Sequence, residues 1–226
     1  MQTPPGFPPN ADLEEQQGKA LIDAAIEHGV SIFVQTTVDR GPNSDTNATD
    51  VAHFASKFRI EKHLLERCRE ASDSKMTFTI LRPTVFMENF SGGFMTKILA
   101  TSLRDGLPAD CPIQMISAKD IGWFGAQALV KSDDPAYRNQ SLSLAGDELS
   151  VEEMQRTYEE VCRRPLPTTF SVVSWALGLM VEGLTKTLRS FRMDGFSADV
   201  QALRALHPEV MTFWRWLEEK QERETG

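Results

Sequence analysis

The sequence lacks several features that mark familiar functional classes. Its three cysteines, Cys68, Cys111 and Cys162, form no C-x-x-C pair and have no histidine at ligand spacing. Metal or redox chemistry is therefore not indicated, and reduced thiols in a hydrophobic core are the better interpretation. Basic residues are outnumbered by acidic ones, 24 to 32. A nucleic-acid partner is not expected, because neutralising phosphates requires a basic face.

The chain also lacks segments that direct a protein into a membrane. The N-terminus has no charged-then-apolar signal sequence. The longest apolar stretch, FSVVSWALGLMVEGL at 170–184, contains Glu182 and is shorter than the roughly 20 residues that a spanning helix needs. We therefore expect a reducing, cytoplasmic compartment, or the nucleus if the protein is a regulator, and no membrane partner.

What the sequence does contain is the alternation of helices and buried strands that is typical of a parallel α/β sheet. Residues 12–28 predict a helix, and the apolar run SIFVQTT at 31–37 predicts a strand covered on both faces. A polar loop at 40–50 leads into a second helix that ends near residue 71. A second buried strand follows at 76–82. This order predicts right-handed crossovers between parallel strands.

The later part of the chain changes character. Short strands are expected at 112–117 and 141–146, and the patterns that begin at Ser117 and Ser150 each predict a capping box. Helical segments are expected near 172–189, 197–206 and 208–223. We interpret this part as a mostly helical cap that leans on the sheet.

Polar groups gather where the two buried strands end. In an open parallel sheet, ligands bind beyond the carboxyl ends of the strands. Thr36 and Thr37 end the first strand, segment 83–89 follows the second, and Lys57 and His53 lie on one face of the helix between them. A lysine ammonium shielded by aromatic rings, near two hydroxyls, can hold a ribose or lower the pKa of a hydroxyl.

Each of these residues also has a simpler structural explanation. Lys57 can extend over the helix edge into solvent, and the threonines can serve only as strand formers. A lone histidine at a helix start, such as His53, is more often a surface or capping residue. Glu88 and Asn89 both suit the first turn of the next helix. Asp120 is explained as the N3 partner of Ser117 in a capping box, so no chemistry is assigned to it.

Five segments, in their order and spacing, resemble the NmrA-like family of atypical short-chain dehydrogenases. They are EQQGKALIDAAIEHGVSIFVQTT, HFASKFRIEKHLLE, TFTILRPTVFMENF, ISAKDIGWFGAQAL and LSLAGDELSVEEM. The resemblance runs from about residue 10 to 220. It implies a partial doubly wound, Rossmann-like parallel sheet with a mostly helical C-terminal substrate or cap region. We expect a single domain, in which residues 1–150 are the remnant of the NAD(P)-binding part and 151–226 the helical part.

The resemblance also implies roles for particular residues and NADP or NAD as the cofactor. The implied cofactor-binding residues are Lys19, Lys57, Phe86, Met87, Glu88 and Asn89. Typical short-chain dehydrogenases have a tyrosine four residues before the helix lysine, where this chain has His53. A reductase would therefore have to use Lys57, with Thr37 as the hydroxyl.

The glycine-rich front of the family fold is not found in these 226 residues. No G-x-G-x-x-G occurs, and neither Gly92-Gly93 nor Gly122-x-x-Gly125 fits the motif. Residues 1–9 resemble the loop after the third family strand, so roughly 60 to 80 residues, at about 30 per βαβ unit, precede that point in the family. They carry the pyrophosphate site and the residue that selects NAD or NADP. We therefore expect cofactor binding by this chain to be weak.

Three functional hypotheses follow. The favoured one is an NmrA-like NAD(P)-dependent oxidoreductase that reduces a small organic substrate and is shortened at its N-terminus. The alternative is a non-catalytic, NAD(P)-sensing regulator or a protein-binding scaffold of the same family. The third is a degenerate product without a function of its own. Without the front strands, the strand at 31–37 becomes a sheet edge, where we expect self-association or a protein partner.

Overall fold

The structure is a computed structural model that describes residues 10–70, 76–171 and 182–225. The strands are β1 (Ile32–Thr36), β2 (Thr77–Pro83), β3 (Val85–Phe86), β4 (Pro112–Ile116), β5 (Gln140–Leu144) and β6 (Asp147–Ser150). The helices are α1 (Ala11–Glu27), α2 (Ala52–Glu70), α3 (Gly93–Gly106), α4 (Ala118–Val130), α5 (Val151–Cys162), α7 (Glu182–Met193), α8 (Val200–Leu206) and α9 (Phe213–Thr225). A short 3-10 helix, η1 (Met87–Phe90), connects β3 to α3.

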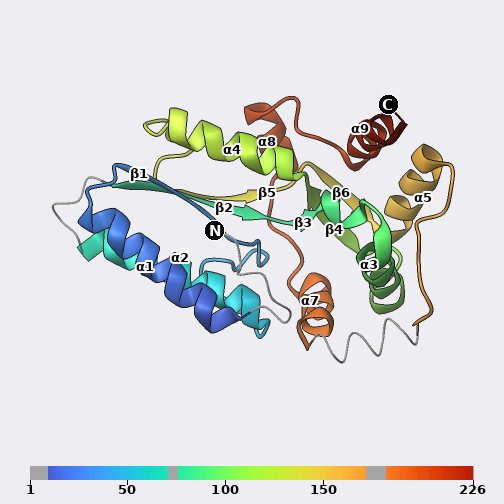
Figure 1. Cartoon of the computed structure of the whole chain (residues 1–226), viewed down its shortest axis with the longest axis horizontal. Coiled ribbons are helices and arrows are strands. Elements are labelled where there is room, and N and C mark those ends of the chain that lie inside the picture. Colours follow the sequence, from blue (N-terminus) through green and yellow to red (C-terminus); the bar gives the residue numbers. More distant parts are fainter. Residues whose placement is uncertain (1–9, 71–75, 172–181, 226) are drawn as a thin grey trace.

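The described strands form two sheets that follow one another across the molecule (Figure 1). The first is parallel, in the order β1-β2-β5, and the second has the order β3-β4-β6. In the second sheet β3 and β4 are parallel, whereas β4 and β6 are antiparallel. The predicted fold class, an α/β protein with a parallel sheet, is confirmed.

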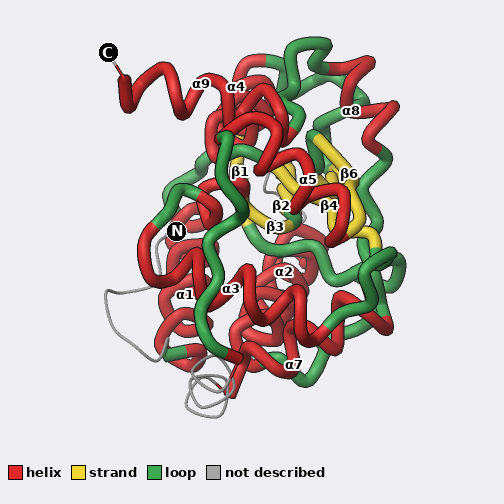
Figure 2. Tube along the Cα trace, turned by 90° about the vertical axis from the view of Figure 1, so that its right-hand side faces the viewer, coloured by secondary structure: helices red, strands yellow, loops and turns green. Residues whose placement is uncertain are grey.

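Helices cover both faces of the first sheet. Helices α1 and α2 lie below it and α4 and α8 above it in Figure 1, and the quarter-turned view in Figure 2 shows the same two layers. Neighbouring residues of β2 show why, because successive side chains of a strand point to opposite faces. Ile80 packs with Ile22 and Ile60 of α1 and α2, whereas Leu81 packs with Phe124 of α4. The apolar run of β2 is therefore buried on both faces, as predicted.

A second core surrounds the other sheet. It contains Leu103 of α3, Ile113 of β4, Met154 of α5 and Leu217 of α9. The predicted C-terminal helix at 208–223 begins later, at Phe213. Of the residues before it, Met211 is buried in this core and Val210 in the core beside the first sheet. The predicted helix at 172–189 falls partly outside the described residues, and α7 occupies its end.

Capping boxes were predicted at the starts of α4 and α5. Helix α5 has the complete motif, and α4 has a variant of it. At α5, Ser150 Oγ accepts from the Glu153 amide at 3.1 Å, and Glu153 Oε2 accepts from the Ser150 amide at 2.8 Å, which is a complete capping box. At α4, Ser117 accepts from the Asp120 amide but donates its hydroxyl to Asp120 Oδ2 at 2.7 Å. The Asp120 carboxylate also accepts from the Met211 amide at 3.0 Å, so it is a structural group.

Strand β1 pairs with β2 only, so within the described residues it is an edge strand. Strand β6 was not predicted, because its sequence DELS is polar and short; pairing with β4 decides its conformation. Among the helices that the structure describes, none has the length and apolar character needed to cross a bilayer.

Candidate functional site

A cavity of about 180 Å³ lies where β1 and β2 end. Its lining combines the chain after β1, helix α2, strand β3, η1 and the helices α3 and α7. The lining residues are Val38, Asp39, Phe54, Thr84, Val85, Phe86, Asn89, Leu99, Leu184, Thr187, Leu188, Phe191 and Phe196. Most of these side chains are apolar, and the position is the one at which parallel sheets bind ligands.

Two larger hollows are more open and lie elsewhere. One, of about 440 Å³, includes Thr77 and Asn139 at the amino ends of β2 and β5. The other, of about 540 Å³, lies between residues 47–50 and the end of α7. The smaller cavity is the better candidate for a ligand site. It lies at the carboxyl ends of the strands, where parallel sheets bind ligands, and its lining is mostly apolar.

The predicted nicotinamide segment divides into two halves. Phe86, which is 39% exposed, and Asn89 line the cavity. Met87 is fully buried, and Glu88 Oε1 accepts from the Ala118 amide at 3.0 Å and from Trp216 Nε1 at 3.3 Å. In a 3-10 helix residues three apart lie on one side, which places Phe86 and Asn89 together. Only these two of the four residues are available to a ligand in the cavity.

Lys57 is held by an ion pair with Glu14 of α1. The Nζ of Lys57 donates to Glu14 Oε1, and Ser56 Oγ donates to Glu14 Oε2 at 2.7 Å. The Glu14 carboxylate is buried, whereas the Lys57 side chain is 22% exposed. Lys57 does not line the cavity, although Phe54, one turn earlier on α2, does. Its observed contact joins two helices.

The remaining predicted residues also lie outside the cavity lining. The Thr37 amide donates to the Leu81 carbonyl at 2.8 Å, and its hydroxyl donates to the same oxygen at 3.4 Å. Lys19 pairs with Glu15 at 2.7 Å on the surface of α1. Burial, followed by the charge of Lys57, lowers the pKa of His53. The structure thus brings Phe86 and Asn89 together but does not place Lys19, Thr37 or Lys57 beside them.

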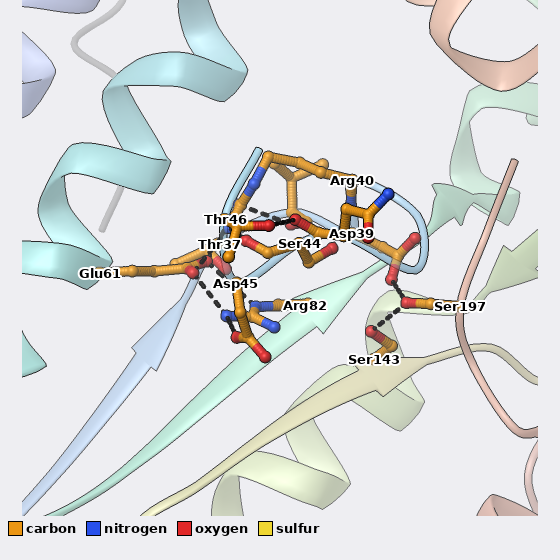
Figure 3. A network of polar contacts seen from close by, with 12 residues as sticks. Thr37, Asp39, Arg40, Ser44, Asp45, Thr46, Glu61, Arg82, Ser143 and Ser197 are labelled. Atoms are coloured by element: carbon orange, nitrogen blue, oxygen red, sulfur yellow. Dashed lines mark hydrogen bonds and ion pairs between the residues drawn. The ribbon is translucent and has the colours of Figure 1, made fainter. Parts of the chain in front are cut away.

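The sequence reasoning missed Asp39, which is the one acidic residue in the cavity lining among the described residues. Its side chain is buried, with 4% of its surface exposed. Oδ1 accepts from the Gly41 amide at 3.0 Å, and Oδ2 accepts from the hydroxyl of Ser197, which contacts Ser143 at 2.9 Å (Figure 3). A carboxylate three residues beyond the end of the parallel strand β1 was the signal that could have identified it.

An ionic network, buried except for the exposed side chain of Asp45, fixes the loop next to Asp39 (Figure 3). Arg40 makes two hydrogen bonds to Glu61, at 2.7 and 3.0 Å. Arg82 bonds Glu61 and Asp45, both at 2.8 Å. Burial opposes the charge of Arg82, but hydrogen bonds and attraction from Glu61 and Asp45 outweigh it and raise its pKa. Two arginines and two carboxylates compensate one another, so the network is structural.

The described residues fit only part of an NAD(P) molecule. Phe86 and Asn89 offer an aromatic ring and an amide to a nicotinamide, but no glycine-rich turn for a pyrophosphate occurs in the 226 residues. Within the described ranges, no cluster of histidine, cysteine and acidic side chains has the makeup of a metal site.

Comparisons with known proteins show the family to which the chain belongs. The model of the NmrA-like family matches residues 3–183. No curated protein matches the chain by sequence. A nucleoside-diphosphate-sugar epimerase from Staphylococcus aureus aligns with 17% identity over 95% of this chain and 74% of its own, with a TM-score of 0.60.

Two further solved structures have the same fold. NmrA, a negative transcriptional regulator solved in complex with NADP, aligns with 16% identity over 91% of this chain and 69% of its own, with a TM-score of 0.60. A UDP-glucuronic acid 4-epimerase from Bacillus cereus, solved with UDP-glucuronic acid and NAD, aligns with 12% identity over 96% and 68%, with a TM-score of 0.59. Identities this low establish the fold alone. With the family match over most of its length, the chain belongs to the NmrA-like family and has a Rossmann-type fold.

Proposed function

We propose that the protein is an NAD(P)-linked oxidoreductase that acts on a small organic substrate held in the cavity beside Phe86 and Asn89. The observation that carries the proposal is the coincidence of three features. The cavity lies at the carboxyl ends of the strands, it is largely apolar, and it is bordered by the segment that the family resemblance assigns to the nicotinamide.

The protein's contribution would be binding and exclusion of water. The phenylalanine and leucine side chains of the cavity surround an apolar substrate, and Asn89 can donate to or accept from a carboxamide. A bound NAD(P)H would supply the hydride. Lys57 and Thr37 remain the proposed catalytic pair, with Lys57 directed to a ribose hydroxyl. That role requires the Lys57 side chain to leave Glu14, because its present contact is on the α1 side.

A second candidate is an NAD(P)-sensing regulator or a scaffold without turnover. The observation that favours it is the state of the expected catalytic groups. Lys57 is bound to a buried carboxylate, and the Thr37 hydroxyl is bound to a backbone carbonyl. Neither group is positioned to transfer a proton to a molecule in the cavity.

The two candidates differ in whether hydride is transferred. NADPH carrying deuterium at the transferable position is incubated with the protein and a set of small aromatic aldehydes and ketones. Mass spectrometry then detects deuterium in the alcohol products. The oxidoreductase proposal predicts labelled product, and Phe86→Ser should reduce the yield. Phe94→Ser is the matched control, because Phe94 is 58% exposed on α3 and does not line the cavity. Absence of label with every substrate would contradict the oxidoreductase proposal and favour the regulator.

A further inference from the structure

Asp39 is a buried carboxylate without a cation. Two hydrogen bonds reach it, from the Gly41 amide and the Ser197 hydroxyl. Within residues 10–70, 76–171 and 182–225, no lysine, arginine or histidine forms an ion pair with it. The nearest arginine in sequence, Arg40, turns its guanidinium toward Glu61, and Figure 3 shows the two groups directed apart.

In the described part of the chain, the Asp39 carboxylate lacks the charged partner that a buried carboxylate normally has. Buried charges in proteins are normally paired, because removing an ion from water is costly unless a partner compensates for it. A carboxylate offers about four acceptor positions. Each carboxylate oxygen of Asp39 accepts one hydrogen bond from the protein. It therefore retains acceptor capacity, and the residue is part of the cavity lining.

The rest of the wall favours a cation as well. Four phenylalanines, Phe54, Phe86, Phe191 and Phe196, line the same cavity. Aromatic rings attract cations through the negative potential of their faces. An anionic ligand would be repelled by Asp39, and a wholly apolar ligand would leave its charge buried without a partner.

The cavity volume limits the size of the ligand. A dry cavity of about 150 Å³ accepts benzene. The present cavity, at about 180 Å³, accommodates one ring and a short substituent.

We propose that Asp39 makes this cavity selective for an organic ammonium ion with a ring-sized apolar body. The N–H groups of the ammonium would donate to the Asp39 carboxylate while the apolar body contacts the phenylalanines. The inference rests on the proposed function for the role of the cavity as the substrate site, and it narrows the substrate class to small organic molecules that carry an ammonium group besides the group that accepts the hydride.

The test compares ligands that differ in charge but not in shape. Benzylamine, benzyl alcohol and benzoate are titrated into the 226-residue protein at neutral pH, without cofactor, and Kd is measured by NMR. Benzylamine should bind about tenfold or more tightly than benzyl alcohol, since a charge-assisted hydrogen bond exceeds a neutral one by about 1.4 kcal/mol, a factor of ten. Benzoate should not bind.

Asp39→Asn should abolish the preference for the amine. The asparagine can keep both present contacts, with its oxygen accepting from Gly41 and its amide donating to Ser197. Asp50→Asn is the matched control, because it removes the same charge from an exposed residue of the neighbouring loop that does not line the cavity. That control should retain the preference.

Several results would overturn the inference. They are absence of saturable benzylamine binding, equal affinity for amine and alcohol, or a preference that persists in Asp39→Asn. If Asp39→Asn does not fold, Phe86→Leu provides the second variant, and the loss of one ring should weaken benzylamine binding about two- to fivefold. Because the assay contains no cofactor, failure of deuterium transfer would leave this inference standing. Transfer to neutral substrates without amine preference would reject this inference alone.

Discussion

At the scale of single residues, Glu14 determines the state of Lys57. The carboxylate is 2% exposed and lies on α1, so it requires a compensating partner, which α2 supplies through Lys57 and Ser56. The sequence places Lys57 on the helix face that can reach a cofactor, but it does not reveal that a glutamate 43 residues earlier faces the same point. The candidate site was therefore only partly predictable: position after the second strand indicated segment 86–89, of which Phe86 and Asn89 line the cavity, whereas the partner of the lysine depends on how two helices pack.

Removal of Lys57 should therefore destabilise the protein independently of any catalytic role. Lys57→Met leaves the Glu14 carboxylate buried without its cation, and we expect a loss of about 1–3 kcal/mol in the free energy of unfolding. The double variant Glu14→Gln/Lys57→Met should recover part of this loss, because the uncompensated charge is gone. Urea unfolding of the single and double variants measures the coupling. Strictly additive effects would show that the ion pair contributes no interaction energy.

His53 should make the stability depend on pH. Burial lowers its pKa below the ordinary value of 6.5, with the charge of Lys57 adding to the shift and Glu14 opposing it. As pH falls below that value, the unfolded chain takes up the proton more readily than the folded one, so acid destabilises the fold. In His53→Gln this contribution is absent. Relative to the variant, the unmodified protein should thus be less stable at pH 5.5 than at pH 7.5, as measured by urea unfolding. If the protein and the His53→Gln variant showed the same change in the free energy of unfolding between pH 5.5 and pH 7.5, the lowered pKa of His53 would be contradicted.

At the scale of elements, one glycine sets the distance between α1 and α2. A Cβ at Gly18 would lie 2.6 Å from Ile60 Cδ1 and 2.8 Å from Cγ1. Ile60 is buried and β-branched, so it cannot easily move aside. The helix pair that carries Glu14 and Lys57 therefore depends on a residue without a side chain at position 18.

Gly18→Ala should lower the free energy of unfolding by about 1–3 kcal/mol, because overpacking outweighs the gain in helix propensity. Gly122→Ala is the matched control. It lies in α4 with nothing within 4 Å of the added Cβ, and it should stabilise the protein by up to about 1 kcal/mol. Thermal or urea unfolding distinguishes the two. Equal effects of the substitutions would show that α1 and α2 do not approach each other as closely as described.

The elements themselves were largely predictable because their patterns are local. The helix at 12–28 and the strand at 76–82 were each displaced by one residue from α1 and β2. Errors arose where long-range contacts decide the conformation. Strand β6 forms because β4 offers it a partner, and Asp39 becomes a cavity wall only because β1 ends beside β3 and α7.

At the scale of the whole molecule, β1 forms an edge of the first sheet among the residues that the structure describes. The Thr37 and Asp39 amides donate to the chain of β2. Because successive amides in a strand point in opposite directions, the amides of Val34 and Thr36 point away from β2. Edge strands without charge, proline or a bulge pair readily with other chains. Residues 32–36 contain no charged residue and no proline.

We therefore expect the 226-residue protein to self-associate through β1. Light scattering after size exclusion should show species larger than the 25.3 kDa chain. Thr36→Pro removes an amide that faces away from β2, so it should reduce association while retaining the pairing of β1 with β2. A monodisperse monomer at all concentrations would contradict this expectation.

We expect the nicotinamide of NAD(P) to contact the protein at Phe86 and Asn89, on the border of the substrate cavity. Saturation-transfer NMR with NADP tests it directly, because the experiment reports which protons of a weakly bound ligand lie against the protein. With no pyrophosphate cradle in the 226 residues, we expect an affinity no better than about millimolar. We expect strong saturation of the nicotinamide protons, weak saturation of the adenine protons, and loss of the nicotinamide signal in Phe86→Ser. Adenine protons saturated as strongly as the nicotinamide protons, with no change in Phe86→Ser, would contradict it.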